Sequence, residues 1–119
     1  MRKKLDALGI SAFCESMGMM LQAGIQTEEA VGLLRQENPN PGPLETGLGH
    51  MQQELEMGGS LSGALEKTGL FPGYAVKMVE AGESAGRLED VLFRLGKYYA
   101  GQKTLSEKLK SAVAYPAAM

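Results

Sequence analysis

Residues 78–92 read MVEAGESAGRLEDVL, and this stretch decides the fold of the chain. Gly82 and Gly86 enclose a short segment that includes the small residues Ser84 and Ala85. Glycine accepts a left-handed backbone and lets neighbouring helices approach closely, so the pattern predicts a tight turn between two helices. After the turn, apolar residues recur with the spacing of one helical face, at Leu88, Val91, Leu92 and Leu95. We therefore expect an elbow that joins two packed helices, the second longer than the first.

The composition favours a single all-α domain. The chain has 119 residues, of which 44% are hydrophobic and 22% are charged. Helix-forming residues predominate, and runs of β-branched and aromatic residues are missing. A net charge of -2 argues against a nucleic-acid binder, which usually has a basic face. The single cysteine allows no internal disulfide.

Capping residues and apolar periodicity divide the chain into six expected helices. Residues 1–7 are predicted to be a charged lead-in or linker, and residues 8–119 one domain. The Pro-rich stretch at 38–43 is predicted to be a surface loop. The expected helices run from about Leu8 to Gly24, from a cap at Thr27 to before Pro39, from Pro43 to Met57, from a cap at Ser60 to Gly69, from Gly73 to Ser84, and from Arg87 towards Tyr115.

Glycines recur inside these helical patterns, where each costs about 1 kcal/mol relative to alanine. Close helix–helix approach is the benefit that we expect from them. The positions concerned are Gly18, Gly32, Gly47, Gly63, Gly82 and Gly96.

The last helix is predicted to extend beyond the core of its own domain. It would have roughly 28 residues and be about 40 Å long at 1.5 Å per residue. Lys103, Lys108 and Lys110 lie near its end, before the apolar stretch AVAYPAAM at 112–119. Cations beside an apolar terminus with an aromatic residue are typical of the cytoplasmic side of a membrane entry point. We expect this end to reach a partner chain or a membrane.

The residue types that carry enzyme chemistry are sparse. His50 is the only histidine, and no second histidine or cysteine completes a zinc set with it. Cys14 shares an apolar face with Phe13 and Met17, which predicts a buried thiol. The residues 82–86 lack the Lys-Ser/Thr ending of a phosphate-binding loop. Neither an enzyme nor a small-molecule substrate is expected.

The carboxylates around the elbow permit two interpretations. Glu80, Glu83, Glu89 and Asp90 could converge on a hard cation such as Ca²⁺, which prefers oxygen ligands. Carboxylates at a helix start more often face water, where they favour the positive end of the helix dipole. Apart from this calcium possibility, no cofactor is expected.

Several motifs together give the chain a family resemblance. Residues 8–119 resemble the type II secretion system F domain, the cytoplasmic repeat of an inner-membrane platform protein in type II secretion and type IV pilus assembly. The motifs are Phe13 with 17–24, GSLSGAL at 59–65, Phe71-Pro72, AGESAGRL at 81–88, and KSAVAYP at 110–116.

The resemblance implies an antiparallel six-helix bundle that occurs twice in a multi-spanning protein of the bacterial inner membrane. This chain is similar to the first cytoplasmic copy, cut before a membrane span that would start soon after Tyr115-Pro116. The implied role is non-catalytic: coupling a cytoplasmic assembly ATPase to the movement of pilin or pseudopilin. The implied partners are that ATPase, other inner-membrane platform proteins and a second copy in a homodimer.

Two functional interpretations follow. The first is a coupling domain of a secretion or pilus platform, and the sequence does not separate these two systems. In it, Glu83, Arg87, Glu89 and Asp90 are predicted to form an exposed contact group for a partner. The alternative is a free-standing helical adaptor that binds a partner peptide in a Met-lined groove.

Overall fold

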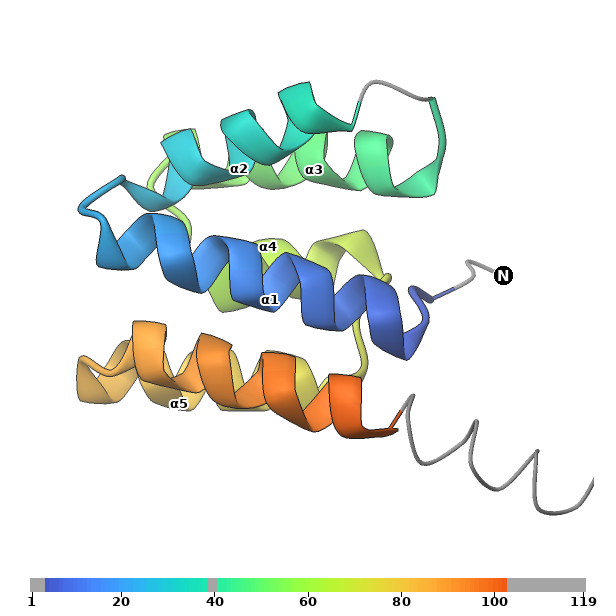
Figure 1. Ribbon diagram of the computed structural model, residues 1–119. Coiled ribbons are helices and arrows are strands. Elements are labelled where there is room, and N and C mark those ends of the chain that lie inside the picture. Colours follow the sequence, from blue (N-terminus) through green and yellow to red (C-terminus); the bar gives the residue numbers. More distant parts are fainter. Residues whose placement is uncertain (1–3, 39–40, 103–119) are drawn as a thin grey trace, which may run out of the picture.

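The computed structural model describes residues 4–38 and 41–102 (Figure 1). These residues form an all-α bundle, as predicted. The helices are α1 (Ala7–Gln22), α2 (Thr27–Glu37), α3 (Pro43–Glu56), α4 (Leu61–Thr68) and α5 (Gly73–Ala85), followed by a helical stretch at 88–102 that we call the sixth helix. Figure 1 shows each helix running back along the one before it, with the pairs arranged as stacked layers.

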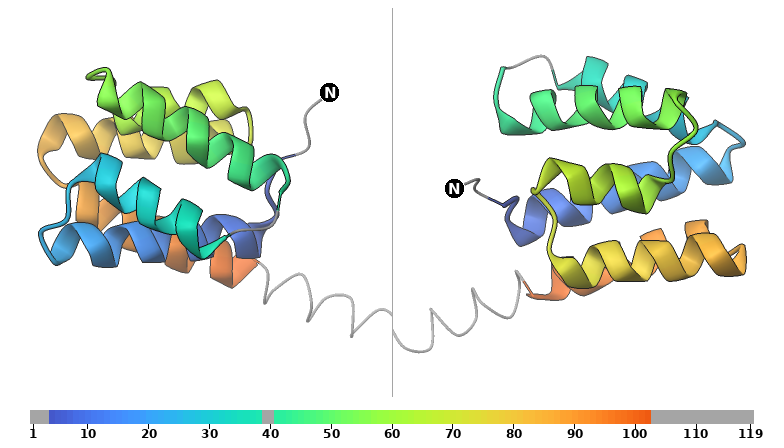
Figure 2. Two further views of the ribbon diagram at one scale, coloured as in Figure 1. Left: turned by 90° about the horizontal axis from the view of Figure 1, so that it is seen from above. Right: turned by 180° about the vertical axis from the view of Figure 1, so that it is seen from behind.

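Helices α2 and α3 form one layer, α1 and α4 the next, and α5 and the sixth helix the last (Figure 1). Helix α2 packs on α3, α3 on α4, and α4 on α5, and the view from behind in Figure 2 shows α3, α4 and α5 one above the other. Ser11 in α1 donates a buried hydrogen bond to the carbonyl of Gly96, with 2.7 Å between the oxygens. This bond fastens the first helix to the sixth, so the last described helix closes the bundle against the first.

One apolar core runs through all the layers. The rings of Phe13 and Phe71 lie 5.0 Å apart, joining α1 to the segment between α4 and α5. The largest fully buried hydrophobic side chains are Ile10, Met17, Leu48, Met51, Leu61, Leu65, Leu92, Leu95, Val31 and Val79. These side chains come from every helix, which explains why the domain needs all six to bury its apolar faces.

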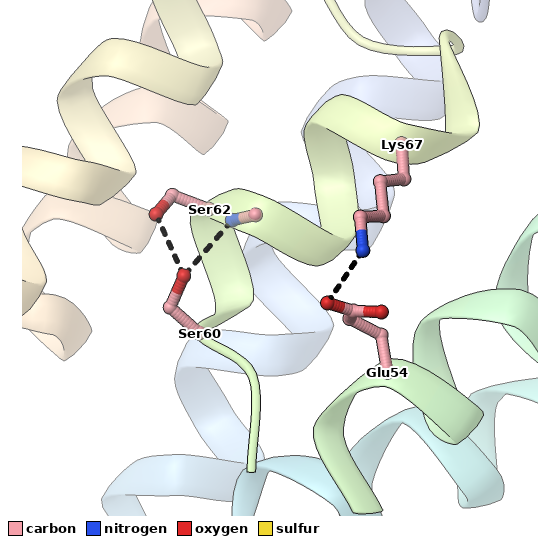
Figure 3. Close-up of polar contacts among 5 residues, drawn as sticks. Glu54, Ser60, Ser62 and Lys67 are labelled. Atoms are coloured by element: carbon pink, nitrogen blue, oxygen red, sulfur yellow. Dashed lines mark hydrogen bonds and ion pairs between the residues drawn. The ribbon is translucent and has the colours of Figure 1, made fainter. Parts of the chain in front are cut away.

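Local signals place most helix ends within one or two residues of the prediction. Gly24 follows α1 with a φ of +92°, and Gly69 ends α4 with a φ of +69°. The hydroxyl of Ser60 accepts from the N–H of Gly63, capping α4 as predicted (Figure 3). The predicted Thr27 cap is wrong, because Gln26 occupies the cap position and Thr27 is already helical.

The lead-in is attached to the bundle where the structure describes it. The Leu5 N–H donates to the carbonyl of Leu70 at 2.9 Å, and the Lys4 ammonium donates to the carbonyl of Phe71 at 3.3 Å. The carboxylate of Asp6 accepts from the Gly9 N–H and caps α1, which therefore begins one residue before the expected domain start. Residues 4–6 thus act as the first packed segment of the domain.

Close helix approach at glycine is confirmed at several positions. A Cβ atom on Gly18 would lie 3.1 Å from the ring of Phe93 in the sixth helix, and one on Gly96 would lie 2.7 Å from the Glu15 side chain in α1. Gly63 is an exception, since within 4–38 and 41–102 a Cβ there would meet the capping hydroxyl of Ser60 and no other helix.

The predicted extension of the last helix towards Tyr115 lies beyond the described residues. Within 4–38 and 41–102, no helix combines the length and the apolar character needed to cross a membrane.

Candidate docking site at the elbow

The predicted elbow is present and tightly built. Helix α5 ends at Ala85, Gly86 has a φ of +70°, and the Arg87 N–H donates to the carbonyl of Gly82 at 2.8 Å. A Cβ on Gly82 would lie 2.8 Å from a methyl of Val91, closer than real Cβ atoms approach. Glycine at 82 therefore lets the sixth helix pack directly on α5.

Glu83 connects the elbow to α4. One oxygen of its carboxylate accepts from the Leu61 N–H at 2.7 Å, and the other accepts from the Ser62 N–H at 3.1 Å. The first N–H groups of a helix have no partner within the helix, and an anion there also meets the positive end of the helix dipole. Together with Ser60, which binds the Gly63 N–H, Glu83 satisfies the start of α4. Both oxygens of Glu83 thus serve the fold.

The other three predicted contact residues are exposed. Arg87 and Arg94 each place a guanidinium nitrogen near the same carboxylate oxygen of Asp90, at 3.7 and 3.8 Å. The Asp90 side chain is 54% exposed, and ion pairs of this kind add little to stability. Glu89 is also exposed. Arg87, Glu89 and Asp90 are therefore available to a partner, and their role in contact stays a prediction.

A groove lies between this charged edge and the turn that joins α1 to α2. Its volume is about 880 Å³, and it is open to solvent. Four half-buried apolar residues line it: Leu21, Ile25, Leu88 and Phe93. Figure 1 shows the α1–α2 turn and the elbow at the same end of the bundle. The groove joins segments about 60 residues apart, so local sequence patterns did not reveal its α1–α2 wall.

The carboxylates considered for calcium do not gather in one site. Glu80 lines a separate cavity of about 270 Å³ beside Lys4 and Lys77, whereas Glu83, Glu89 and Asp90 line the groove. In the described part of the chain, no group of three or more His, Cys, Asp or Glu residues could hold a metal ion. The geometry thus gives calcium no preformed site, and calcium binding stays an untested prediction.

Cys14 has the properties of a core residue, as predicted. It is 2% exposed, and burial, with a smaller contribution from the nearby Glu15 carboxylate, raises the pKa of its thiol from 9.0 to about 12. A thiol with this pKa stays protonated at neutral pH and is a poor nucleophile. His50 is exposed on α3.

Comparison with known protein families shows the family to which the chain belongs. Residues 13–119 match the family described as type II secretion system (T2SS), protein F. The chain belongs to this family. The match confirms the resemblance inferred from the sequence motifs.

Named relatives come from both pilus assembly and secretion. The chain is 30% identical to the type IV pilus assembly protein PilC of Pseudomonas aeruginosa, over 98% of this chain and 31% of that protein. It is 31% identical to the protein transport protein HofC homolog of Escherichia coli, over 84% of this chain and 25% of the relative. It is 29% identical to the type II secretion system protein F of Xanthomonas campestris pv. campestris, over 98% and 29%. The chain thus spans less than a third of the length of these relatives.

Proposed function

We propose that the chain is a structural coupling domain of a platform protein in type II secretion or type IV pilus assembly. The match of residues 13–119 to the protein F family carries this proposal. In it, the domain lies on the cytoplasmic side of the bacterial inner membrane and links an assembly ATPase to the movement of pilin or pseudopilin. Its partners are that ATPase, other platform proteins of the inner membrane and a second copy of the domain.

The geometry suits a part that transmits force. Every layer of the bundle contributes to one core, and the elbow is fastened at Gly82, Glu83 and Gly86. A domain packed in this way can transmit a force applied to one face to another face without unfolding locally. The exposed edge at Arg87, Glu89 and Asp90 supplies a surface for a partner.

The proposal is tested in the organism that carries the gene. Deleting the gene should abolish surface piliation or the export of a secreted protein, and the full-length gene should restore whichever output was lost. Measuring both outputs also separates the pilus system from the secretion system. If deletion changed neither output, the proposed function would be refuted.

A second experiment tests the link to the ATPase. The full-length protein, solubilised in detergent, should retain the cognate assembly ATPase in a pull-down, and substitutions on one face of the domain should weaken this retention. Retention that no surface substitution of the domain alters would show that the ATPase does not contact this domain.

The adaptor alternative receives no comparable support. Met17 is fully buried in the core, and none of the methionines in the described part of the chain lines the groove at the elbow. Met19 is 56% exposed on α1 but does not line this groove. A Met-lined peptide site is therefore not formed by this groove.

A further inference from the structure

The groove at the elbow combines an apolar floor with walls from two distant parts of the chain. Leu21 and Ile25 form one side, from the end of α1 and the turn after it, and Leu88 and Phe93 form the other side from the sixth helix. All four side chains remain partly exposed, and Leu21, Ile25 and Leu88 also pack against the core. An apolar floor of this kind offers an anchoring place for a large apolar side chain of a partner.

The rim of the groove is acidic. Glu89 and Asp90 lie in the first turn of the sixth helix, and Glu28 and Glu29 lie in the first turn of α2, next to the lining residue Thr27. Glu83 also lines the groove, but both of its oxygens are bound at the start of α4. Two cations lie on the same side: Arg87, which lines the groove, and Arg94, which lies 3.8 Å from Asp90. Without Glu83, the four carboxylates and two guanidinium groups leave a net charge of -2 around the groove.

The starts of α4 and α2 differ in whether side chains bind their first backbone N–H groups. The start of α4 is satisfied by Ser60 and Glu83, whereas Gln26 makes no side-chain cap at the start of α2. Gln26 and Thr27 line the groove. Glu28 and Glu29 in the first turn of α2 offset the positive end of its dipole, so the open start does not oppose a cationic partner.

We propose that this groove docks a segment of a partner protein in which an apolar anchor is flanked by lysine or arginine residues. The apolar anchor occupies the groove between Ile25 and Phe93, and the flanking lysine or arginine side chains contact the acidic rim. Complementary charge steers such a segment towards the groove and disfavours wrong partners. The same acidic rim repels nucleic acid and anionic lipid surfaces, so a cationic protein segment is the occupant that the charges select. This inference rests on the proposed function, because it specifies the partner of the platform domain.

Photocrosslinking tests the occupant directly. In the full-length protein, produced in its own organism, Gln26 is replaced with p-benzoylphenylalanine, which places the crosslinker on the groove without removing a charge or a cap. The same replacement at Gln53, exposed on α3 and outside the groove, is the control. After irradiation, the crosslinked peptide is identified by mass spectrometry.

The proposal predicts a crosslink to another protein at 26 and not at 53, within a segment that carries at least two Lys or Arg residues beside an apolar residue. It is overturned if the crosslinked segment is neutral or acidic, if it belongs to a second copy of this chain, if the crosslink is to lipid, or if no crosslink forms at 26.

Charge reversal supplies a functional test. The double substitution Glu89→Lys with Asp90→Lys should lower the crosslink yield from Gln26 about tenfold, because two favourable charges become repulsive. Pilus or secretion output should fall with it, while protein abundance is kept. The control is Glu37→Lys with Glu56→Lys, which makes the same charge change at exposed sites outside the groove.

The two proposals can fail separately. If gene deletion abolishes output but the Glu89→Lys, Asp90→Lys variant keeps both output and crosslink yield, the groove inference is wrong and the proposed function stands. If gene deletion leaves output unchanged, the proposed function itself is wrong.

Discussion

The elbow has two sides that carry the same kind of side chain for different purposes. On the side towards α4, both oxygens of Glu83 are bound to backbone N–H groups of Leu61 and Ser62. On the side towards the groove, the carboxylates of Glu89 and Asp90 are exposed, and Asp90 forms two long surface ion pairs, with Arg87 and Arg94. Residues within one short stretch thus divide into a structural group and an exposed group that is available to a partner. The division depends on which neighbour each side chain reaches.

The largest expected effect is at Glu83. Glu83→Ala leaves two N–H groups at the start of α4 without their charged acceptor and should lower the free energy of unfolding by about 2–3 kcal/mol. Glu83→Gln keeps one acceptor oxygen and should cost less. Urea unfolding followed by circular dichroism measures both variants. A change below about 0.5 kcal/mol for Glu83→Ala would show that the structural side of the elbow has been misassigned.

The next effect tests the turn that separates the two sides. Gly86→Val should cost about 2 kcal/mol, since a β-branched residue strains at a φ of +70°. An added Cβ would meet nothing within 4 Å, so the cost comes from the backbone alone. Gly86→Asn should therefore be much milder, because asparagine tolerates this conformation. Equal melting temperatures for the two variants would contradict this explanation.

A smaller effect separates the two helix starts. Ser60→Ala removes the hydroxyl that accepts from Gly63 and should cost about 1 kcal/mol. Gln26→Ala removes no cap and should leave the free energy of unfolding nearly unchanged. Chemical unfolding of the two variants under one set of conditions measures the difference. A Gln26→Ala loss as large as that of Ser60→Ala would mean that the start of α2 is not open.

The smallest effect on stability is expected on the groove side. Glu89→Gln with Asp90→Asn should change the free energy of unfolding by no more than about 0.5 kcal/mol, because exposed ion pairs contribute little. The same unfolding assay applies. A loss of 2 kcal/mol or more, on the order of a buried pair, would place these residues with Glu83 in the structural group.

Helix ends were predictable from the sequence because their causes are local. The Ser60 cap depends on Gly63, three residues away, and the stops at Gly24, Gly69 and Gly86 depend on the conformation of a single glycine. The approach of the sixth helix to α5 at Gly82 was predictable for the same reason, since Val91 follows only nine residues later.

The roles within the elbow could not be predicted, because they depend on distant segments. The partners of Glu83 lie 21 and 22 residues earlier in the chain, so its carboxylate was grouped with the exposed ones. The groove needed the α1–α2 turn, and nothing in the pattern around Gln26 or Ile25 indicates that this turn lies opposite Leu88. The attachment of Leu5 to Leu70 is likewise a contact across 65 residues.

One measurement tests the division of the elbow most directly: pilus or secretion output per molecule of full-length protein in cells that carry Glu83→Ala or Glu89→Lys with Asp90→Lys. We predict that Glu83→Ala lowers the amount of protein but leaves the output per molecule close to that of the wild type. We predict that the double reversal keeps the amount and lowers the output per molecule about tenfold. The opposite pattern, or a double reversal with full output per molecule, would contradict the assignment of the groove side to a partner.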